Sequence, residues 1–234
     1  MNRVLAAEAL GTALLTATVI GSGIMGEDMS GGIPGIALLG NTLATAAMLY
    51  VLVTLLRPVS GAQMNPVVTV VMAARGATPW ASVPGLVIAQ TLGAAAGAAT
   101  ANLMFGRALF SAATTVRAGD GQWLAEAIAT FVLVLAIVGV ARSRPERLPA
   151  TVALTITAGY WFTASTSFAN PAVTIARSLS DSFAGIDPAN VPAFIVAQAA
   201  GAVIAVVVDR ALLAPQSGGK IAGEGSPIPP PGTG

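Results

Sequence analysis

The chain has 234 residues, of which 55% are hydrophobic and 9% are charged, with a net charge of +1. Because about a quarter of the residues in a soluble domain carry charge, this composition excludes an ordinary soluble protein and gives no sign of nucleic-acid binding. Cysteine and histidine are both absent, so we expect no disulfide, metal site, cofactor or enzymatic activity.

The first half of the chain contains three apolar segments of membrane-spanning length. They cover residues 4–24, 33–56 and about 80–105, and the first has no signal-peptide cleavage site. A helical span needs about 20 residues. The apolar stretch 65–74 is too short for this, so we predict that it enters the membrane and returns or lies on its surface.

The second half repeats this order. Residues 122–141 and 149–166 are the predicted fourth and fifth spans, a second short helix begins at Asn170, and residues 191–214 form the last span. Residues 215–234 are rich in Gly, Pro and Ser, which is typical of a disordered tail.

Each short helix begins with an Asn-Pro box. Asn is a preferred helix N-cap, and Pro at the first helical position loses no needed hydrogen-bond donor. The polar segments that precede the boxes would be costly in hydrocarbon, so they must face protein or water. The boxes consist of Asn65, Pro66, Val67 and of Asn170, Pro171, Ala172.

The two halves are related as repeats. An Ala-Glu pair opens each half, at Glu8 and Glu126, and an Ala-Gln-x-x-Gly-Ala pattern also occurs twice. Because each half crosses the membrane an odd number of times, the second is inverted relative to the first, and the two short helices meet near the midplane. We expect a single membrane domain, 1–214, with repeats of about 4–105 and 122–214.

The basic residues predict the orientation. With the N-terminus inside, the inner segments contain eight of the 11 basic residues, namely Arg3, Arg57, Arg75, Arg142, Arg144, Arg147, Arg210 and Lys220. This bias predicts that both termini, including the tail, are cytoplasmic and that the protein lies in the inner (plasma) membrane.

In these motifs the chain, over about residues 4–214, resembles the aquaporin and aquaglyceroporin family (major intrinsic proteins). The resemblance implies an all-α membrane fold with six transmembrane helices and two re-entrant half-helices in an inverted repeat. It also implies a homotetramer in the lipid bilayer, with one passive pore for small neutral solutes per subunit. Asn65 and Asn170 would line that pore, and Glu8 and Glu126 would accept the backbone N–H bonds that hold the Asn-Pro loops.

The family's selectivity-filter positions, counted from the two boxes, are Thr45, Ala158, Ser167 and Val173. Water-selective members usually place an aromatic residue, a histidine, a small residue and an arginine there. Val173 supplies neither the charge nor the donors of an arginine, so we expect a wide, neutral filter. It suits water and larger solutes such as glycerol, urea or metalloid acids, including arsenite and organoarsenicals, while Val67 replaces a common Ala and would narrow the midplane slightly.

For two further arginines and one aromatic run, we expect roles outside solute recognition. We expect Arg177 to contact solvent or lipid headgroups rather than to replace a filter arginine, and Arg57 to flank the cytoplasmic mouth. The aromatic run 160–162 favours contact with lipid and helices over solute recognition.

Two alternatives to a channel remain. A secondary active transporter also uses inverted repeats with broken helices, and here its coupling groups would be Glu8 and Glu126. A closed structural membrane protein is the other alternative, but the short loops and absent soluble domain give it no support.

Overall fold

The computed structural model describes residues 2–213, and this part of the chain consists of helices joined by irregular segments, with no β-strand. The eight α-helices are α1 (Arg3–Met29), α2 (Pro34–Ser60), α3 (Pro66–Ala74), α4 (Val83–Met104), α5 (Asp120–Ser143), α6 (Leu148–Phe162), α7 (Pro171–Arg177) and α8 (Val191–Val208). The predicted all-α fold with two short helices is confirmed. The predicted tail, 215–234, lies outside the described residues.

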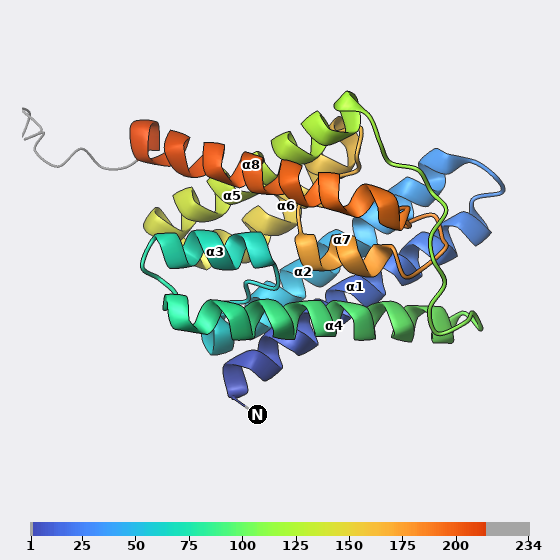
Figure 1. The fold of residues 1–234 in the computed structure, drawn as a ribbon, viewed down its shortest axis with the longest axis horizontal. Helices are drawn as coiled ribbons and strands as arrows, with labels where there is room; N and C mark the ends of the chain where they lie inside the picture. The colour runs from blue at the N-terminus through green and yellow to red at the C-terminus, as the bar shows by residue number, and fades with distance from the viewer. Residues whose placement is uncertain (1, 214–234) are drawn as a thin grey trace, which may run out of the picture.

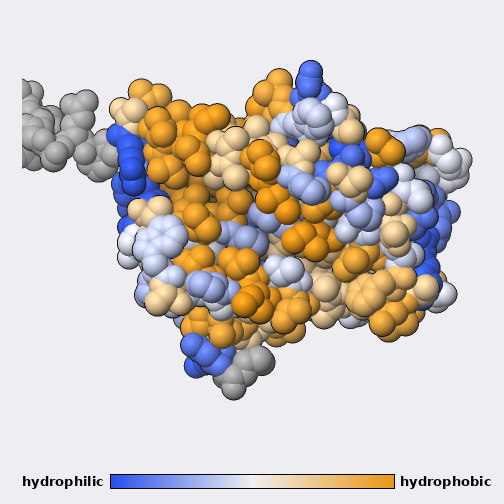
Figure 2. Space-filling view, viewed as in Figure 1, coloured by the Kyte–Doolittle hydropathy of each residue, from blue (hydrophilic) through white to orange (hydrophobic). Residues whose placement is uncertain are grey.

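Most of the long helices can cross a membrane by length and composition. Five segments meet this description: Arg3–Met29, Pro34–Ser60, Trp80–Met104, Asp120–Ser143 and Pro188–Leu213. Hydrophobic side chains cover much of the face between the hydrophilic groups at its two ends (Figure 2). The protein is therefore an integral, multi-pass membrane protein.

The remaining span, α6, is shorter than predicted. Its 15 residues end at Phe162 rather than at 166, and at 1.5 Å per residue they extend about 22 Å. A 3-10 turn, Pro145–Arg147, precedes the helix. After Phe162 the chain leaves the helix, and Thr166 and Ser167 have positive φ angles, so these residues belong to the irregular segment that leads to α7.

The two short helices occupy the middle of the molecule. In Figure 1, α3 and α7 lie end to end between α4 and α8, and their N-termini face each other. The long helices pack in matching pairs, α1 against α2 and α4 in one half and α5 against α6 and α8 in the other. Each short helix contacts a span from the opposite half, α7 against α4 and α3 against α8, so the central region is built from both halves.

Glycines allow the closest of these contacts. A Cβ atom on Gly93 would lie 2.2 Å from the carbonyl oxygen of Ala9, and one on Gly201 would lie 2.1 Å from that of Ala127. Gly97 makes the same kind of contact with α1 one turn further along. No side chain fits between these backbones, which is typical of small-residue packing between membrane helices.

Candidate functional site

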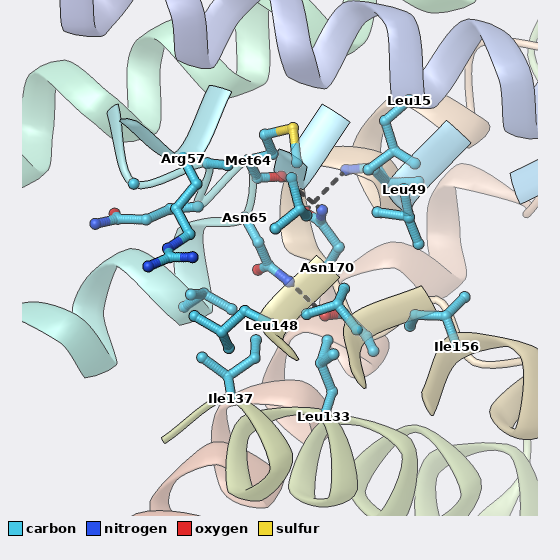
Figure 3. Close-up of a pocket in the computed structure, with 18 of the residues that line it drawn as sticks. Leu15, Leu49, Arg57, Met64, Asn65, Leu133, Ile137, Leu148, Ile156 and Asn170 are labelled. Atoms are coloured by element: carbon cyan, nitrogen blue, oxygen red, sulfur yellow. Dashed lines mark hydrogen bonds between the residues drawn. The ribbon is translucent and has the colours of Figure 1, made fainter. Parts of the chain in front are cut away.

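A cavity of about 350 Å³ runs through the centre of the helix bundle. Residues near one end of the bundle, such as Arg57 and Leu148, and residues toward the other end, such as Thr45 and Arg177, line the same cavity. Figure 3 shows Asn65 and Asn170 in its middle, surrounded by apolar side chains from several helices. The leucines and isoleucines labelled there are Leu15, Leu49, Leu133, Ile137, Leu148 and Ile156.

The two box asparagines bond across the centre of the cavity. Nδ2 of Asn65 donates to the carbonyl oxygen of Ala169 at 2.7 Å, and Nδ2 of Asn170 donates to that of Met64 at 2.8 Å (Figure 3). Each side-chain oxygen also caps its own helix, at 3.1 Å from the N–H of Val67 or Ala172. The asparagines therefore join α3 to α7.

Matching residues before the two boxes have left-handed backbone conformations. Three residues before each asparagine, Ala62 and Ser167 have φ of 49° and 53°. One residue before it, Met64 and Ala169 have φ of 46° and 47°. Non-glycine residues adopt such angles at a cost of about 1–3 kcal/mol each, so neighbouring groups must hold these segments in place.

Glu8 holds the segment before the first box. Its Oε1 accepts from the hydroxyl of Ser60 at 2.6 Å and from the N–H of Gln63 at 2.9 Å. Its Oε2 accepts from the N–H of Met64 at 2.5 Å and from Nε2 of Gln90 at 2.8 Å. The carboxylate is fully buried, and these four donors surround it.

Glu126 makes the equivalent contacts before the second box. Its Oε1 accepts from Ser165 at 2.6 Å and from the N–H of Phe168 at 2.8 Å. Its Oε2 accepts from the N–H of Ala169 at 2.9 Å and from Nε2 of Gln198 at 2.7 Å. Like Glu8, it is fully buried and does not line the cavity, so the coupling groups that a transporter would need are bound to backbone and amide donors.

Three of the four predicted filter residues line the cavity, and one does not. Thr45, Ser167 and Val173 are buried and border it. Ala158 is exposed on α6 and does not border the cavity, whereas Tyr160 does and approaches the Thr45 hydroxyl with its own at 3.3 Å.

The expected position on α6 is therefore corrected. Successive residues of an α-helix point about 100° apart, so an error of one or two positions moves a side chain from the cavity to the outer surface. A Cβ on Gly159 would lie 2.5 Å from the hydroxyl of Ser167, so Gly159, and not Ala158, faces the segment before the second box. Of the aromatic run expected to contact lipid and helices, Tyr160 instead borders the cavity, while Trp161 and Phe162 are exposed.

The predicted contact of Arg177 with solvent or headgroups is wrong. Only 2% of its surface is exposed, and it lines the cavity instead of contacting solvent or headgroups. Its Nε donates to the carbonyl oxygen of Ala184, and its guanidinium carbon lies 3.3 Å from the centroid of the Phe168 ring. Because it follows Val173 by four residues, it lies on the same face of α7, one turn further out.

A second arginine approaches the Phe168 ring from a different segment. The guanidinium carbon of Arg117, in the connection between α4 and α5, lies 5.0 Å from the ring centroid. Its Nε donates to the carbonyl oxygen of Gly185 at 2.8 Å. Burial lowers the pKa of Arg117 from its ordinary value, since desolvation disfavours the charged form.

The other box residues pack between helices. Val67 joins a buried cluster with residues of α5 and α8 and does not line the cavity, so it does not narrow the midplane as expected. Ala172 packs with residues of α1 and α4. Arg57 is half-buried at the other end of the cavity, where its Nη1 donates to the carbonyl oxygen of Pro145 at 2.6 Å.

Sequence reasoning missed Tyr160, Phe168 and Arg177 as cavity residues. Arg177 had a readable signal, its i+4 spacing from Val173 on a short helix that was already placed at the centre. Phe168 lies within a polar segment that was expected to face water or protein, and no sequence pattern indicates which of the two its ring faces.

Comparison with known proteins agrees with this geometry. The family model described as "Major intrinsic protein" matches residues 1–160 and 121–227. The chain is 48% identical to aquaglyceroporin AqpS of Rhizobium meliloti over 215 residues, which cover 92% of each protein. It is 35% identical over 206 residues to aquaporin NIP1-1 of Oryza sativa subsp. japonica, covering 84% of this chain and 69% of that protein.

A solved structure shows the same fold. The X-ray structure of the aquaglyceroporin from Plasmodium falciparum matches 90% of this chain and 96% of its own, with a TM-score of 0.65 at 21% identity. The family match and the similar relatives exclude an enzyme and give no support to a coupled transporter. The chain belongs to the major intrinsic protein family and is a passive membrane channel.

Proposed function

We propose that this channel passes water together with larger uncharged solutes, such as glycerol, urea and undissociated metalloid acids including arsenite and organoarsenicals. The observation that carries the proposal is that Val173 borders the 350 Å³ cavity together with Thr45 and Ser167. At this position water-selective relatives place an arginine, which is larger and charged. Val173 leaves more room, and the hydroxyls of Thr45, Ser167 and Tyr160 remain as uncharged hydrogen-bonding groups.

The filter that we propose is thus Thr45, Tyr160, Ser167 and Val173, with Asn65 and Asn170 at the midplane. A passing solute exchanges its water contacts for the hydroxyls, the asparagine amides and carbonyl oxygens of the two irregular segments. The apolar side of the cavity makes no competing hydrogen bonds. These groups replace part of the hydration that a solute gives up along the path, which lowers the barrier to its passage.

Cations are expected to be excluded. Each half-helix directs roughly half a positive charge from its N-terminus toward the centre, and the cavity offers a cation no carboxylate among the described residues that line it. A cation that enters loses much of its hydration and finds no carboxylate to compensate its charge.

We propose the inner (plasma) membrane, with both termini in the cytoplasm, as the site of the protein, and a homotetramer as its assembly. The orientation is supported by the excess of basic residues in the segments assigned to the inside. The chain contains no cysteine, so single-cysteine variants test the proposed orientation directly. A membrane-impermeant maleimide applied to intact cells should label Thr114→Cys and not Ser143→Cys, and native mass spectrometry should show four copies.

Stopped-flow light scattering on reconstituted vesicles tests the solute class. Vesicles that contain the protein should admit glycerol, urea and arsenite faster than protein-free vesicles, and an imposed proton or sodium gradient should not change the rates. Glycerol and arsenite fluxes equal to those of protein-free vesicles would refute the wide filter. Dependence on an ion gradient would instead indicate a transporter.

A further inference from the structure

The charged residues that line the cavity are all positive within the described part of the chain. Arg57 lies near one end and Arg177 near the other, and no aspartate or glutamate borders the space between them. The two buried carboxylates nearest the half-helices, Glu8 and Glu126, are occupied by hydrogen-bond donors behind the cavity wall. Among the described residues, the cavity lining therefore carries positive charge and no negative charge.

Arg177 has hydrogen-bond donors that are not used within the described part of the protein. Its Nε bonds to Ala184, and among the described residues its two terminal nitrogens donate no hydrogen bond and no carboxylate lies within ion-pair distance. Its contact with the Phe168 ring orients the guanidinium plane without using those nitrogens. Arg117, against the same ring, adds a second positive charge rather than a counter-charge.

A buried cation that forms no ion pair inside a membrane protein is costly and marks a functional site by default. A guanidinium presents its N–H groups as a planar fork that pairs with two oxygens of one acid group. Arg177 borders the cavity, and Val173, one turn inward, also borders it and is short and apolar, so it leaves room for such a group next to Arg177. The geometry suits a small solute whose charge is shared over two or three oxygens.

We infer that the outer end of the cavity binds small monovalent oxyanions at Arg177, and that the channel admits small oxyacids in their anionic form as well as neutral solutes. The inference rests on the proposed function, since the anion must enter the same path as the neutral solutes. The positive ends of the two half-helices at the centre and Arg57 at the far end lower the barrier for an anion along the rest of this path.

Methanesulfonate is a suitable probe, because this small oxyanion has no neutral form near neutral pH and so does not cross lipid as an acid. Vesicles placed in potassium methanesulfonate with valinomycin, which carries the potassium, swell only if the anion crosses. Glycerol flux is measured on the same vesicles as the reference for a folded, open channel. We expect wild-type vesicles to swell with methanesulfonate and valinomycin faster than protein-free vesicles.

Three variants test whether methanesulfonate flux depends on Arg177. Arg177→Gln should lower the ratio of methanesulfonate to glycerol permeability by about tenfold or more, whereas Arg177→Lys should retain most of it. Arg107→Gln removes a positive charge from the connection after α4, at a residue that donates to the carbonyl of Asp181 and does not line the cavity, and should leave the ratio unchanged.

The outcomes separate the two proposals. Glycerol flux without methanesulfonate flux in the wild type, or an unchanged ratio in Arg177→Gln, would overturn the anion site and leave the neutral channel standing. Loss of both fluxes in the wild type would overturn the proposed function and this inference with it.

Discussion

The guanidinium carbon of Arg177 lies 3.3 Å from the centroid of the Phe168 ring, so the last residue of α7 is fixed by a residue that precedes the second Asn-Pro box. The same ring meets Phe194 of α8 edge-on, with centroids 5.1 Å apart and planes at 69°, and Arg117 approaches it from the α4–α5 connection. One aromatic side chain therefore joins three segments at the outer end of the cavity.

Phe168→Leu should destabilise the protein by about 2–4 kcal/mol, because it removes a buried aromatic side chain and its contacts with two arginines. The apparent melting temperature in detergent, followed by size-exclusion fluorescence, measures this. Phe162→Leu is the matched control, since Phe162 is 57% exposed. Equal melting temperatures for the two variants would contradict the role assigned to the ring.

Val173→Arg should lower glycerol flux by about tenfold or more while water flux falls much less, since a barrier increase of about 1.4 kcal/mol already gives tenfold. The new side chain would fill space beside Thr45 and Ser167 and place a charge one turn below Arg177. Val173→Leu adds bulk without charge and should have a smaller effect. Stopped-flow measurements with glycerol and with an impermeant osmolyte separate the two fluxes, and an unaltered glycerol rate would show that Val173 is not at the constriction.

Glu126→Gln should lower stability and leave flux independent of a proton gradient. A carboxamide has one acceptor oxygen, so its NH₂ group would face the N–H groups of Phe168 or Ala169, and leaving one such group unsatisfied costs about 1–3 kcal/mol. Melting temperature and yield of the purified variant report the loss. The control, Glu27→Gln, changes an exposed glutamate and should have no effect. If Glu126→Gln instead kept normal stability and lost a pH response of transport, proton coupling would be supported.

Asn170→Asp separates two roles of one side chain. Aspartate keeps the oxygen that caps α7 at the N–H of Ala172 but loses the donor to the carbonyl of Met64. We expect lower thermal stability, because two acceptors then face each other, and a larger potassium leak, because a negative charge replaces a neutral amide at the midplane. Asn170→Ala also loses the cap, worth about 1 kcal/mol, and a potassium leak as large in this variant would show that charge is not the cause.

Gly201→Ala should prevent normal packing of α8 against α5, since the added Cβ would lie 2.1 Å from the carbonyl oxygen of Ala127. Gly139→Ala is the control within α5, where the nearest atom to the new Cβ is 4.0 Å away on the Leu213 side chain. There the substitution should be neutral or stabilising by about 0.5–1 kcal/mol, because alanine favours a helix interior. The melting temperatures of the two variants in detergent distinguish these expectations. Similar melting temperatures would mean that α5 and α8 can move apart at little cost.

The sequence by itself determined the membrane class, the positions of most spans and the two short helices. These features follow from local chemistry: a span is recognised by about 20 apolar residues, and a helix start by Asn followed by Pro. The odd number of crossings in each half then gave the inverted arrangement, because a chain that crosses three times must end on the opposite side. The resemblance pointed to Thr45, Ser167 and Val173, all of which border the cavity.

Only the tertiary structure decided which other side chains reach the cavity. A helix turns about 100° per residue, so whether Ala158 or Tyr160 faced inward depended on the packing of α6 and not on its composition. Arg177 would extend to solvent if α7 stood alone. It is buried because the Phe168 ring and the carbonyl oxygen of Ala184, which come from the segments on either side of α7, close around it, and contacts between separate segments leave no periodic pattern in the sequence.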